Sequence, residues 1–245
     1  MLNQIHNIDC LIGMNDIPDK SIDMILCDLP YGTTKNKWDS LIDLDLLWKQ
    51  YMRIIKDNGA IVLTAQTPFD KVLGMSNFKY LRYEWIWEKD NATGFLNANR
   101  MPLKSHENIL VFYKKLPTYH PQKTKGKPYK AMRGRKSDNY GVYRATLTDN
   151  KGDRYPRSVV RFDKAKHTLH PTQKPVSLFE YLIKTYTNEG ETVLDNCIGS
   201  GTTAIACMNT NRHFIGFELN KEYYDIAKER IKARRKELEH DKSNF

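Results

Sequence analysis

Two short stretches of the sequence carry side chains that could do chemistry, each at the point where an apolar run ends. In "VLDNCIGSGTTAIA" the run stops at Asp195, and Gly199 and Gly201 precede a helical pattern. Glycine lets a backbone approach a ligand closely, and the first turn of a helix offers free N–H groups. A second apolar run ends at Glu218, about twenty residues on, where nucleotide-binding sheets place an acidic residue on ribose hydroxyls. The spacing predicts a nucleoside site, although a carboxylate that only caps the last helix is an alternative for Glu218.

The other stretch is "CDLPYGTTKNKWD", which closes a different apolar run with Asp28, Leu29, Pro30 and Tyr31. Pro30 has no N–H group and a fixed φ, so the strand cannot continue and the chain must turn where side chains reach solvent. This turn is predicted to form a second site. An ordinary turn, with Tyr31 covering the end of a sheet, is the alternative.

Alternating strands and helices are predicted to position both stretches. Strands are predicted over 21–27, 60–65, 80–89, 107–114, 191–196 and 213–219, and helices over 43–59, 68–75, 174–189, 200–210 and 221–242. Gly59 is the predicted stop of the first of these helices, and Gly190 is expected just beyond the third. Such alternation favours an α/β fold with a mostly parallel twisted sheet and helices on both faces, so both stretches should lie along its carboxyl edge.

Periodicity is weak between residues 116 and 170, where irregular structure is predicted. From 114 to 166 there are sixteen Lys and Arg against four Asp, a net charge of +12, whereas the rest of the chain carries −2. Aromatic residues are interleaved with these cations, namely Tyr119, Tyr129, Tyr140, Tyr143, Tyr155 and Phe162. Cations for phosphates and aromatic faces for bases favour nucleic acid as the partner. A solvated basic loop with structural tyrosines is the alternative.

Length and composition set wider limits. The 245 residues can form one α/β domain with an insertion, or two small domains. The chain contains neither an apolar stretch long enough to span a bilayer nor a secretory signal, so a cytoplasmic protein without a membrane partner is expected. The four cysteines are widely spaced in sequence and are expected to be reduced, buried thiols. His167 and His170 lack partners at ligand spacing, so no metal is predicted.

In type and in order, these stretches resemble the motifs of the S-adenosylmethionine-dependent DNA amino-methyltransferases. "DLPYGTTKNKWD" is similar to their Asp-Pro-Pro-Tyr catalytic motif, and "LDNCIGSGTT" to their cofactor loop, usually Asp-Pro-Phe-x-Gly-Ser-Gly-Thr. "HPTQKP" resembles the segment that precedes that loop. The catalytic motif comes first, the variable basic segment next and the cofactor loop last, which is the permuted order called the beta class. The similarity covers nearly all of the chain outside residues 116–165.

The resemblance implies a Rossmann-like methyltransferase fold, circularly permuted in motif order, with S-adenosylmethionine as cofactor and double-stranded DNA as partner. It divides the chain into a catalytic half (1–115), a basic target-recognition insertion (116–165) and a cofactor-binding half (166–245). The implied catalytic residues are Asp28, Leu29, Pro30 and Tyr31. The implied cofactor-binding residues are Asp9, Cys10, Asp28, Asp195, Asn196, Cys197, Gly199, Ser200, Gly201, Thr202, Thr203, Glu218 and Leu219. For Asp9, a surface carboxylate in a turn is the alternative. A restriction-modification role and a possible homodimer are also implied.

The implied reaction is direct methyl transfer to the exocyclic amine of a flipped adenine. Asp28 and the carbonyl of Leu29 would accept hydrogen bonds from the amine, and Tyr31 would stack on the base, a contact that contributes roughly 1–3 kcal/mol. Asp rather than Ser at position 28 favours adenine. Cytosine N4, an RNA base or a protein amide are alternative acceptors, and a nucleic-acid-binding protein without catalysis is a further hypothesis.

Two departures from the family pattern affect these expectations. Leu29 replaces the usual first proline, which retains the backbone carbonyl but removes the rigidity of the ring. Asn196 and Cys197 replace Pro and Phe in the cofactor loop, so a looser contact with the methionine part of the cofactor is expected. The recognition sequence depends on geometry that the sequence does not display.

Overall fold

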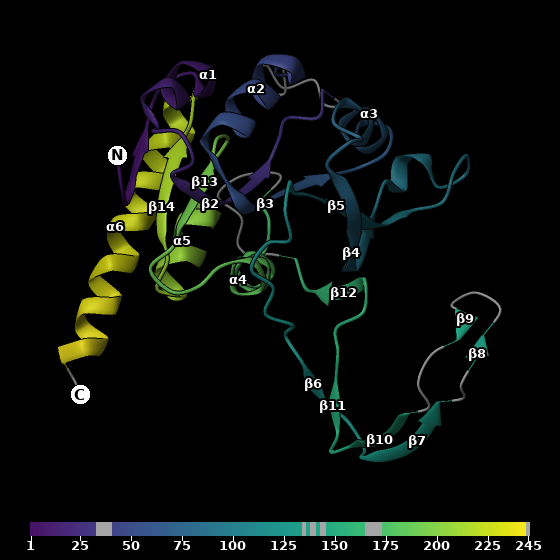
Figure 1. Cartoon of the computed structure of the whole chain (residues 1–245). Coiled ribbons are helices and arrows are strands. Elements are labelled where there is room, and N and C mark those ends of the chain that lie inside the picture. The colour runs from purple at the N-terminus through teal and green to yellow at the C-terminus, as the bar shows by residue number, and fades with distance from the viewer. Residues whose placement is uncertain (33–40, 134–135, 138–140, 143–145, 165–172, 244–245) are drawn as a thin grey trace. The chain divides into compact units, whose positions relative to one another are not determined.

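The structure, a computed structural model, describes residues 1–32, 41–133, 136–137, 141–142, 146–164 and 173–243. It divides the chain into two compact units, a larger one of residues 1–120 and 158–245 and a smaller one of residues 121–157. In chain order, the larger unit contains β1 (Gln4–His6), α1 (Cys10–Gly13), the 3-10 turn η1 (Met14–Asp16), β2 (Ile22–Asp28), α2 (Leu44–Ile54), β3 (Ile55–Ala65), α3 (Phe69–Ser76), β4 (Leu81–Thr93), the 3-10 turn η2 (Phe95–Asn97), β5 (Lys104–Phe112), β12 (Val159–Phe162), α4 (Val176–Tyr186), β13 (Thr192–Asp195), α5 (Thr202–Asn209), β14 (His213–Phe217) and α6 (Lys221–Ser243) (Figure 1).

The larger unit is built on an eight-stranded sheet in the order β1-β14-β13-β2-β3-β5-β4-β12. Among the described pairings of this eight-stranded sheet, only those of β5 with β3 and β4 are antiparallel. The connection from β4 to β5 is short, and a parallel pairing would need a crossover of about a dozen residues or more, so β5 runs against its neighbours. The predicted mostly parallel sheet is confirmed, with one reversed strand that periodicity alone did not indicate.

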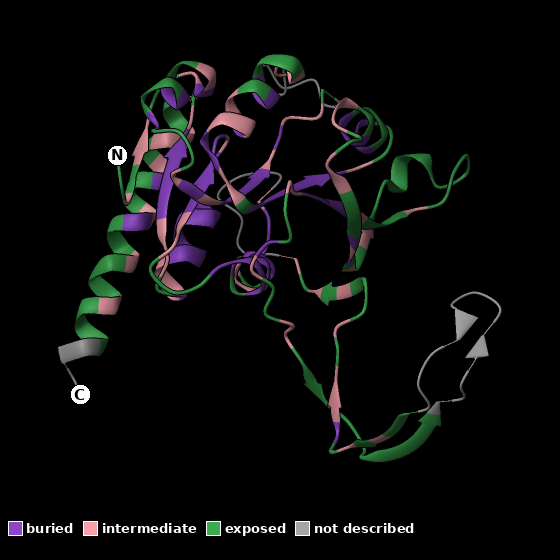
Figure 2. Cartoon of the chain, in the orientation of Figure 1, coloured by how far each residue is buried: buried purple, intermediate pink, exposed green. Residues whose placement is uncertain are grey.

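Helices cover both faces of the sheet, as predicted. Along β2, Ile25 and Cys27 belong to the core shared with α1, α2 and α3, whereas Met24 and Leu26 belong to the core shared with α4, α5 and α6. Successive side chains of a strand point to opposite faces, so one strand contributes to both cores. Figure 2 shows that the central strands are buried, which fits a parallel sheet covered on both sides.

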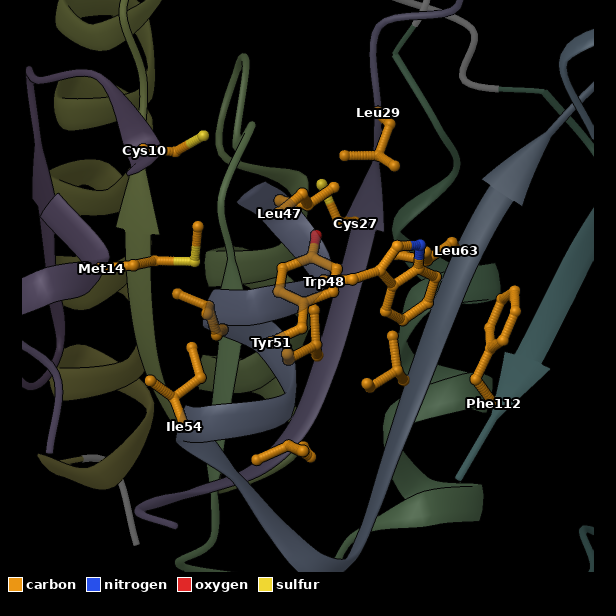
Figure 3. Packing of buried hydrophobic residues seen from close by; sticks show 14 of the residues in the cluster. Cys10, Met14, Cys27, Leu29, Leu47, Trp48, Tyr51, Ile54, Leu63 and Phe112 are labelled. Carbon is orange, nitrogen blue, oxygen red and sulfur yellow. The ribbon is translucent and has the colours of Figure 1, made fainter. Parts of the chain in front are cut away.

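Helix α2 illustrates how local sequence and packing agree. The Asp43 side chain accepts a hydrogen bond from the N–H of Leu46 at 3.0 Å and so caps the helix. One face of α2 is buried, and Trp48 and Tyr51 on that face pack into the core of the sheet (Figure 3). The centroid of the Trp48 ring lies 4.9 Å from the centroid of the Phe112 ring on β5. This packing fixes α2 over the strands whose ends carry the predicted sites.

One predicted helix end was wrong. Helix α2 ends at Ile54, and Gly59 lies instead within β3. A Cβ at Gly59 would stand 2.8 Å from the carbonyl oxygen of Asp23, so this glycine permits close approach of two strands. Gly190 lies beyond the end of α4, as predicted, but the helix already ends at Tyr186 because Thr187 adopts an extended conformation.

The smaller unit contains three pairs of short antiparallel strands, which are β6 (Thr124–Lys125) with β11 (Asp153–Arg154), β7 (Tyr129–Arg133) with β10 (Thr146–Asn150), and β8 (Lys136–Ser137) with β9 (Gly141–Val142). Irregular structure was predicted over 116–170, and it is wrong for these strands. It is also wrong for β12, which pairs in parallel with β4 in the main sheet. Among the described helices, none is both long enough and apolar enough to cross a membrane.

Candidate active site

The two predicted stretches meet at one edge of the sheet. Strands β13 and β2 are parallel neighbours, with Leu194 paired to Ile25, so their carboxyl ends lie side by side. A cavity of about 830 Å³ opens at this edge and is lined from both stretches. Ligand pockets usually enclose roughly 300–1,000 Å³, so this one has room for a nucleoside-sized molecule.

Most of the predicted site residues line this cavity. They are Asp9, Cys10, Asp28, Leu29, Pro30, Tyr31, Asp195, Asn196, Cys197, Gly199, Ser200, Thr202, Glu218 and Leu219. Gly201 and Thr203 are not among the lining residues. Gly201 stands before α5 with φ +85°, and Thr203 is fully buried. Thr203 supports the loop through the hydrogen bond from its hydroxyl to Asp195.

Asp28, the last residue of β2, is surrounded by hydrogen-bond donors. The Tyr31 hydroxyl donates to Asp28 Oδ1 at 2.6 Å, and the Thr64 hydroxyl donates to the same oxygen. Thr64 can reach it because the two residues are directly paired across β2 and β3. The other oxygen, Oδ2, lies 2.5 Å from the Lys174 ammonium. The carboxylate is therefore held in one orientation, with its side chain still 22% exposed.

Lys174 also connects Asp28 to a second buried carboxylate. Its Nζ lies 3.3 Å from Glu107 Oε2, and Glu107 Oε1 lies 2.6 Å from the ammonium of Lys89. Burial raises the pKa of Glu107, but Lys174 and Lys89 outweigh burial and hold that pKa below its usual value. Burial lowers the pKa of Lys174, but Asp28 and Glu107 outweigh it and raise that pKa. We call these four residues the charge quartet; it contains two cations and two anions.

The neighbours of Asp28 in sequence are held by packing. The Tyr31 ring stacks on Phe69 with 5.4 Å between ring centroids, and Lys174 Nζ lies 5.6 Å from the Tyr31 centroid. Leu29 is 3% exposed and belongs to the core. Burial of this side chain constrains the turn where the family pattern uses a proline ring.

Asp195 braces the glycine loop from below. Its Oδ1 accepts a hydrogen bond from the N–H of Cys197 at 3.1 Å, and its Oδ2 accepts one from the Thr203 hydroxyl. Burial raises the pKa of Asp195 to about 7, although these hydrogen bonds oppose the shift. The carboxyl group therefore ties the start of the loop to the first turn of α5.

Gly199 and Glu218 close the other end of the cavity. Gly199 has φ +53°, and a Cβ at this position would meet no atom within 4 Å, so the loop leaves open space there. Glu218 accepts hydrogen bonds from the N–H groups of Gly199 at 2.9 Å and Asn220 at 2.8 Å. Burial raises the pKa of Glu218. Each carboxylate oxygen has a second lone pair that a ligand hydroxyl could use.

The thiols of Cys10 and Cys197 line the cavity, and the fully buried thiol of Cys27 lies next to that of Cys197. The Asn196 amide lies 3.6 Å from Cys10 Sγ and 3.4 Å from Cys197 Sγ, and its oxygen accepts a hydrogen bond from the buried Tyr51 hydroxyl. A hydrogen bond from Cys197 lowers the pKa of Cys10, whereas burial raises the pKa of Cys27 to about 12. The cysteines are free, as expected, but sequence spacing did not indicate that three of them meet.

Asp9 lines the cavity and also caps α1, where it accepts a hydrogen bond from the N–H of Leu11 at 2.8 Å. Asp9 therefore lies where it could face a ligand, and its contact with the cofactor stays a prediction. Trp38, His167 and His170 lie outside the described residues. Within the described part of the chain, no cluster of three or more His, Cys, Asp and Glu could hold a metal ion.

Comparison with known proteins agrees with this geometry. The N6_N4_Mtase family, described as DNA methylase, matches residues 22–229. The chain belongs to this DNA methylase family. The type II methyltransferase M.BglII of Bacillus subtilis is 32% identical to it over 257 aligned residues, which cover 92% of this chain and 68% of that protein. The DNA adenine methyltransferase YhdJ of Escherichia coli (strain K12) is 28% identical, with 91% of this chain and 80% of that protein covered.

Solved structures of methyltransferases share the fold. The crystal structure of the M1.HpyAVI-SAM complex has a TM-score of 0.64 and 26% identity to this methylase, covering 93% of this chain and 98% of that chain. The PvuII DNA methyltransferase, described as cytosine-N4-specific, has a TM-score of 0.69 at 15% identity, covering 91% of this chain and 84% of that one. The predicted Rossmann-like methyltransferase fold is confirmed.

Proposed function

We propose that this DNA methylase transfers a methyl group from S-adenosylmethionine to the N6 amine of an adenine flipped out of double-stranded DNA at a specific sequence. One observation carries the proposal. Asp28 with Tyr31, and the glycine loop with Glu218, line a single cavity, so an acceptor base and a nucleoside cofactor could occupy its two ends at once.

The glycine-loop end suits the cofactor. When bound, S-adenosylmethionine supplies a methyl group made electrophilic by its positive sulfur. The open space beside Gly199 admits a ligand against the backbone, and the Glu218 carboxylate has lone pairs for ribose hydroxyls. Asn196 and Cys197 also line the cavity, and we expect the methionine part to pass them on its way towards Asp28. The difference from the family pattern is that the thiol of Cys197 lines the cavity where the family usually has an aromatic side chain.

The Asp28 end suits an exocyclic amine. Such an amine is a poor nucleophile because its lone pair is delocalised into the ring. Asp28 Oδ2 and the carbonyl of Leu29 would accept hydrogen bonds from its two hydrogens and so favour a pyramidal nitrogen. The charge quartet holds Asp28 in place, and the Tyr31 ring, backed by Phe69 on one side, would stack on the base. Unstacking the target base costs about a few kcal/mol, which this contact would partly offset.

Adenine is the acceptor favoured by Asp28 and by the likeness to YhdJ. The cytosine-N4 specificity named for the PvuII enzyme supports the second candidate, because the two amines present the same pair of hydrogens to Asp28. The smaller unit would contact DNA, since residues 121–157 carry eleven Lys and Arg against three Asp. In that unit, the Arg154 guanidinium stands 4.7 Å from the Tyr129 ring centroid. The cytoplasmic location and the possible homodimer remain predictions.

Sequencing modified bases in cells that express the protein would identify the target, and matched oligonucleotides would test it. We expect radiolabel from the cofactor on duplex DNA with adenine at the target position, and none when that adenine alone is replaced. Label on cytosine supports the second candidate, and label on RNA but not DNA contradicts the proposal.

Asp28→Ala and Asp28→Asn test the assigned residue. Both variants should bind duplex DNA and lose methylation, whereas Asp45→Ala, at an exposed site on α2, should keep both. The Asn variant preserves the shape of the side chain, so a folding defect of the Ala variant alone would not obscure the result. Methylation by either Asp28 variant at the wild-type rate would contradict the assigned role.

A further inference from the structure

The connection between β4 and β5 holds two large apolar side chains out in solvent. Phe95 is 71% exposed, and Leu96, the next residue, is fully exposed. Figure 2 shows this connection as an exposed segment that projects from the sheet. Apolar side chains of this size, adjacent at the tip of one projection, mark an interaction site more often than isolated surface residues do.

The projection is an ordered turn. Gly94, which precedes η2, has φ +93°, a conformation that glycine adopts without strain. Backbone hydrogen bonds then close the turn, from the N–H of Asn97 to the carbonyl of Gly94 at 2.9 Å and from the N–H of Ala98 to the carbonyl of Phe95 at 3.1 Å. Little conformational entropy would remain to be lost when this tip enters a partner.

The tip begins at the cavity. Thr93, the last residue of β4, lines the cavity together with Lys89 and Glu107 of the charge quartet. Phe95 follows two residues later, and two residues of chain span at most about 7 Å. The two apolar side chains therefore stand two and three residues beyond the cavity wall that Lys89 and Glu107 share with Thr93, which is the wall beside the Asp28 end, where the acceptor base would enter.

The chemistry around the tip suits a nucleic acid. Arg100 and Lys104, on the return to β5, are exposed cations that could reach phosphates, and Asn97 and Asn99 are exposed amides that could meet base edges. A purely apolar protein contact would not call for this polar and basic surround. The charge complementarity favours a polyanion that also offers flat apolar surfaces, which is a stack of base pairs.

We infer that Phe95 and Leu96 form a wedge that enters the DNA base stack at the position vacated by the flipped base. This inference rests on the proposed function, because only a flipping enzyme creates such a gap. Removing a base from the stack exposes the faces of its neighbours, and an inserted apolar side chain covers them again. The wedge would thus stabilise the extrahelical state without touching the reacting amine.

The Phe95→Ala/Leu96→Ala double variant tests the wedge. Its matched control is Phe78→Ala/Leu116→Ala, because these side chains are 67% and 78% exposed and do not line the cavity. Methylation rates are measured on two duplexes that carry the sequence methylated in cells. In one the target base is paired, and in the other it faces an abasic site and is already destabilised. We expect a loss of about tenfold or more in kcat/KM on the paired duplex, which corresponds to about 1.4 kcal/mol.

On the abasic duplex the double variant should stay within about threefold of wild type, a change of less than 1 kcal/mol. Fluorescence of 2-aminopurine at the target position should rise when wild type binds with S-adenosylhomocysteine, and should not rise with the variant. Equal losses on the two duplexes, or no loss, would overturn the wedge. So would a loss that accompanies a change from dimer to monomer in sedimentation, which would indicate a self-association surface. A wild-type protein that methylates neither duplex would instead refute the proposed function.

Discussion

Removal of the Lys174 ammonium should destabilise the fold and the acceptor site together. In Lys174→Met the methylene stem stays in place, while Asp28 loses the cation at 2.5 Å and Glu107 loses the one at 3.3 Å. Lys174 is only 6% exposed, so water cannot replace it readily. Glu107 keeps Lys89, so Asp28 is the carboxylate left without a counter-ion.

Breaking a buried ion pair by removing one partner costs about 3–5 kcal/mol. A typical domain is stable by about 5–15 kcal/mol, so Lys174→Met should unfold at a clearly lower urea concentration than wild type. The control is Lys221→Met, which removes an exposed helix pair with Asp225 and should cost about 0.3–0.5 kcal/mol. Adding Asp28→Asn to Lys174→Met removes the uncompensated charge and should restore part of the loss.

The loss should also depend on pH. The pKa of Glu107 lies below its usual value in the folded protein, so its share of stability is present above about pH 4.5 and disappears as pH falls through the folded pKa. The difference in unfolding free energy between wild type and Lys174→Met should therefore shrink in acid. A variant within 1 kcal/mol of wild type at pH 7, with full methylation activity, would refute the reasoning about the charge quartet.

Three further predictions concern individual residues of the site. The pKa of Asp195 is about 7 in the folded protein and 3.8 as a reference, so this carboxyl group should lower the free energy of unfolding by roughly 4 kcal/mol as pH rises from about 4 to 7. Urea titrations of Asp195→Asn should therefore find a free energy of unfolding that depends less steeply on pH, and an unchanged slope would contradict this. Gly199 and Gly190 have φ values of +53° and +79° with open space around either added Cβ, so Gly199→Ala and Gly190→Ala introduce similar backbone strain. Calorimetry should find similar losses of stability, of about 1 kcal/mol, but only Gly199→Ala should raise the KM for the cofactor. Tyr31→Phe removes the hydroxyl that donates to Asp28 at 2.6 Å and keeps the ring, so kcat should fall about tenfold in steady-state assays while the KM for DNA changes little; an equal rise in that KM would speak against the assignment.

The parts of the site that the sequence predicted share a local signature. Asp28, Asp195 and Glu218 each follow an apolar run, and the end of a buried strand can be recognised within a few residues. Parallel strands then place such ends on one edge of the sheet, which the structure confirms. The strand-helix alternation was equally local, and so the fold class was predictable.

The charge quartet was not predictable from local patterns. Lys89, Glu107 and Lys174 lie far apart in the sequence, and each resembles an ordinary surface charge. Only the order of the strands, with the reversed β5 beside β4, brings the first two together. The segment "HPTQKP" contains Lys174 and pointed to this region, but its sequence alone did not indicate a contact with Asp28. The prediction that Gly59 ends a helix was wrong for a similar reason, because the backbone that leaves no room for a Cβ there belongs to Asp23 on another strand.

The residues that flank the smaller unit are each fixed by a backbone hydrogen bond within the larger unit. The N–H of His120 donates to the carbonyl of Thr185 at 2.8 Å, and the N–H of Ile86 donates to the carbonyl of Ser158 at 2.7 Å. The described residues between these two points contribute no strand to the eight-stranded sheet and no side chain to the cavity, so under the proposed function this segment could be replaced as one piece. If residues 121–157 contact DNA as proposed, replacing them during evolution would change the DNA sequence that is recognised and leave the methyl-transfer site unchanged.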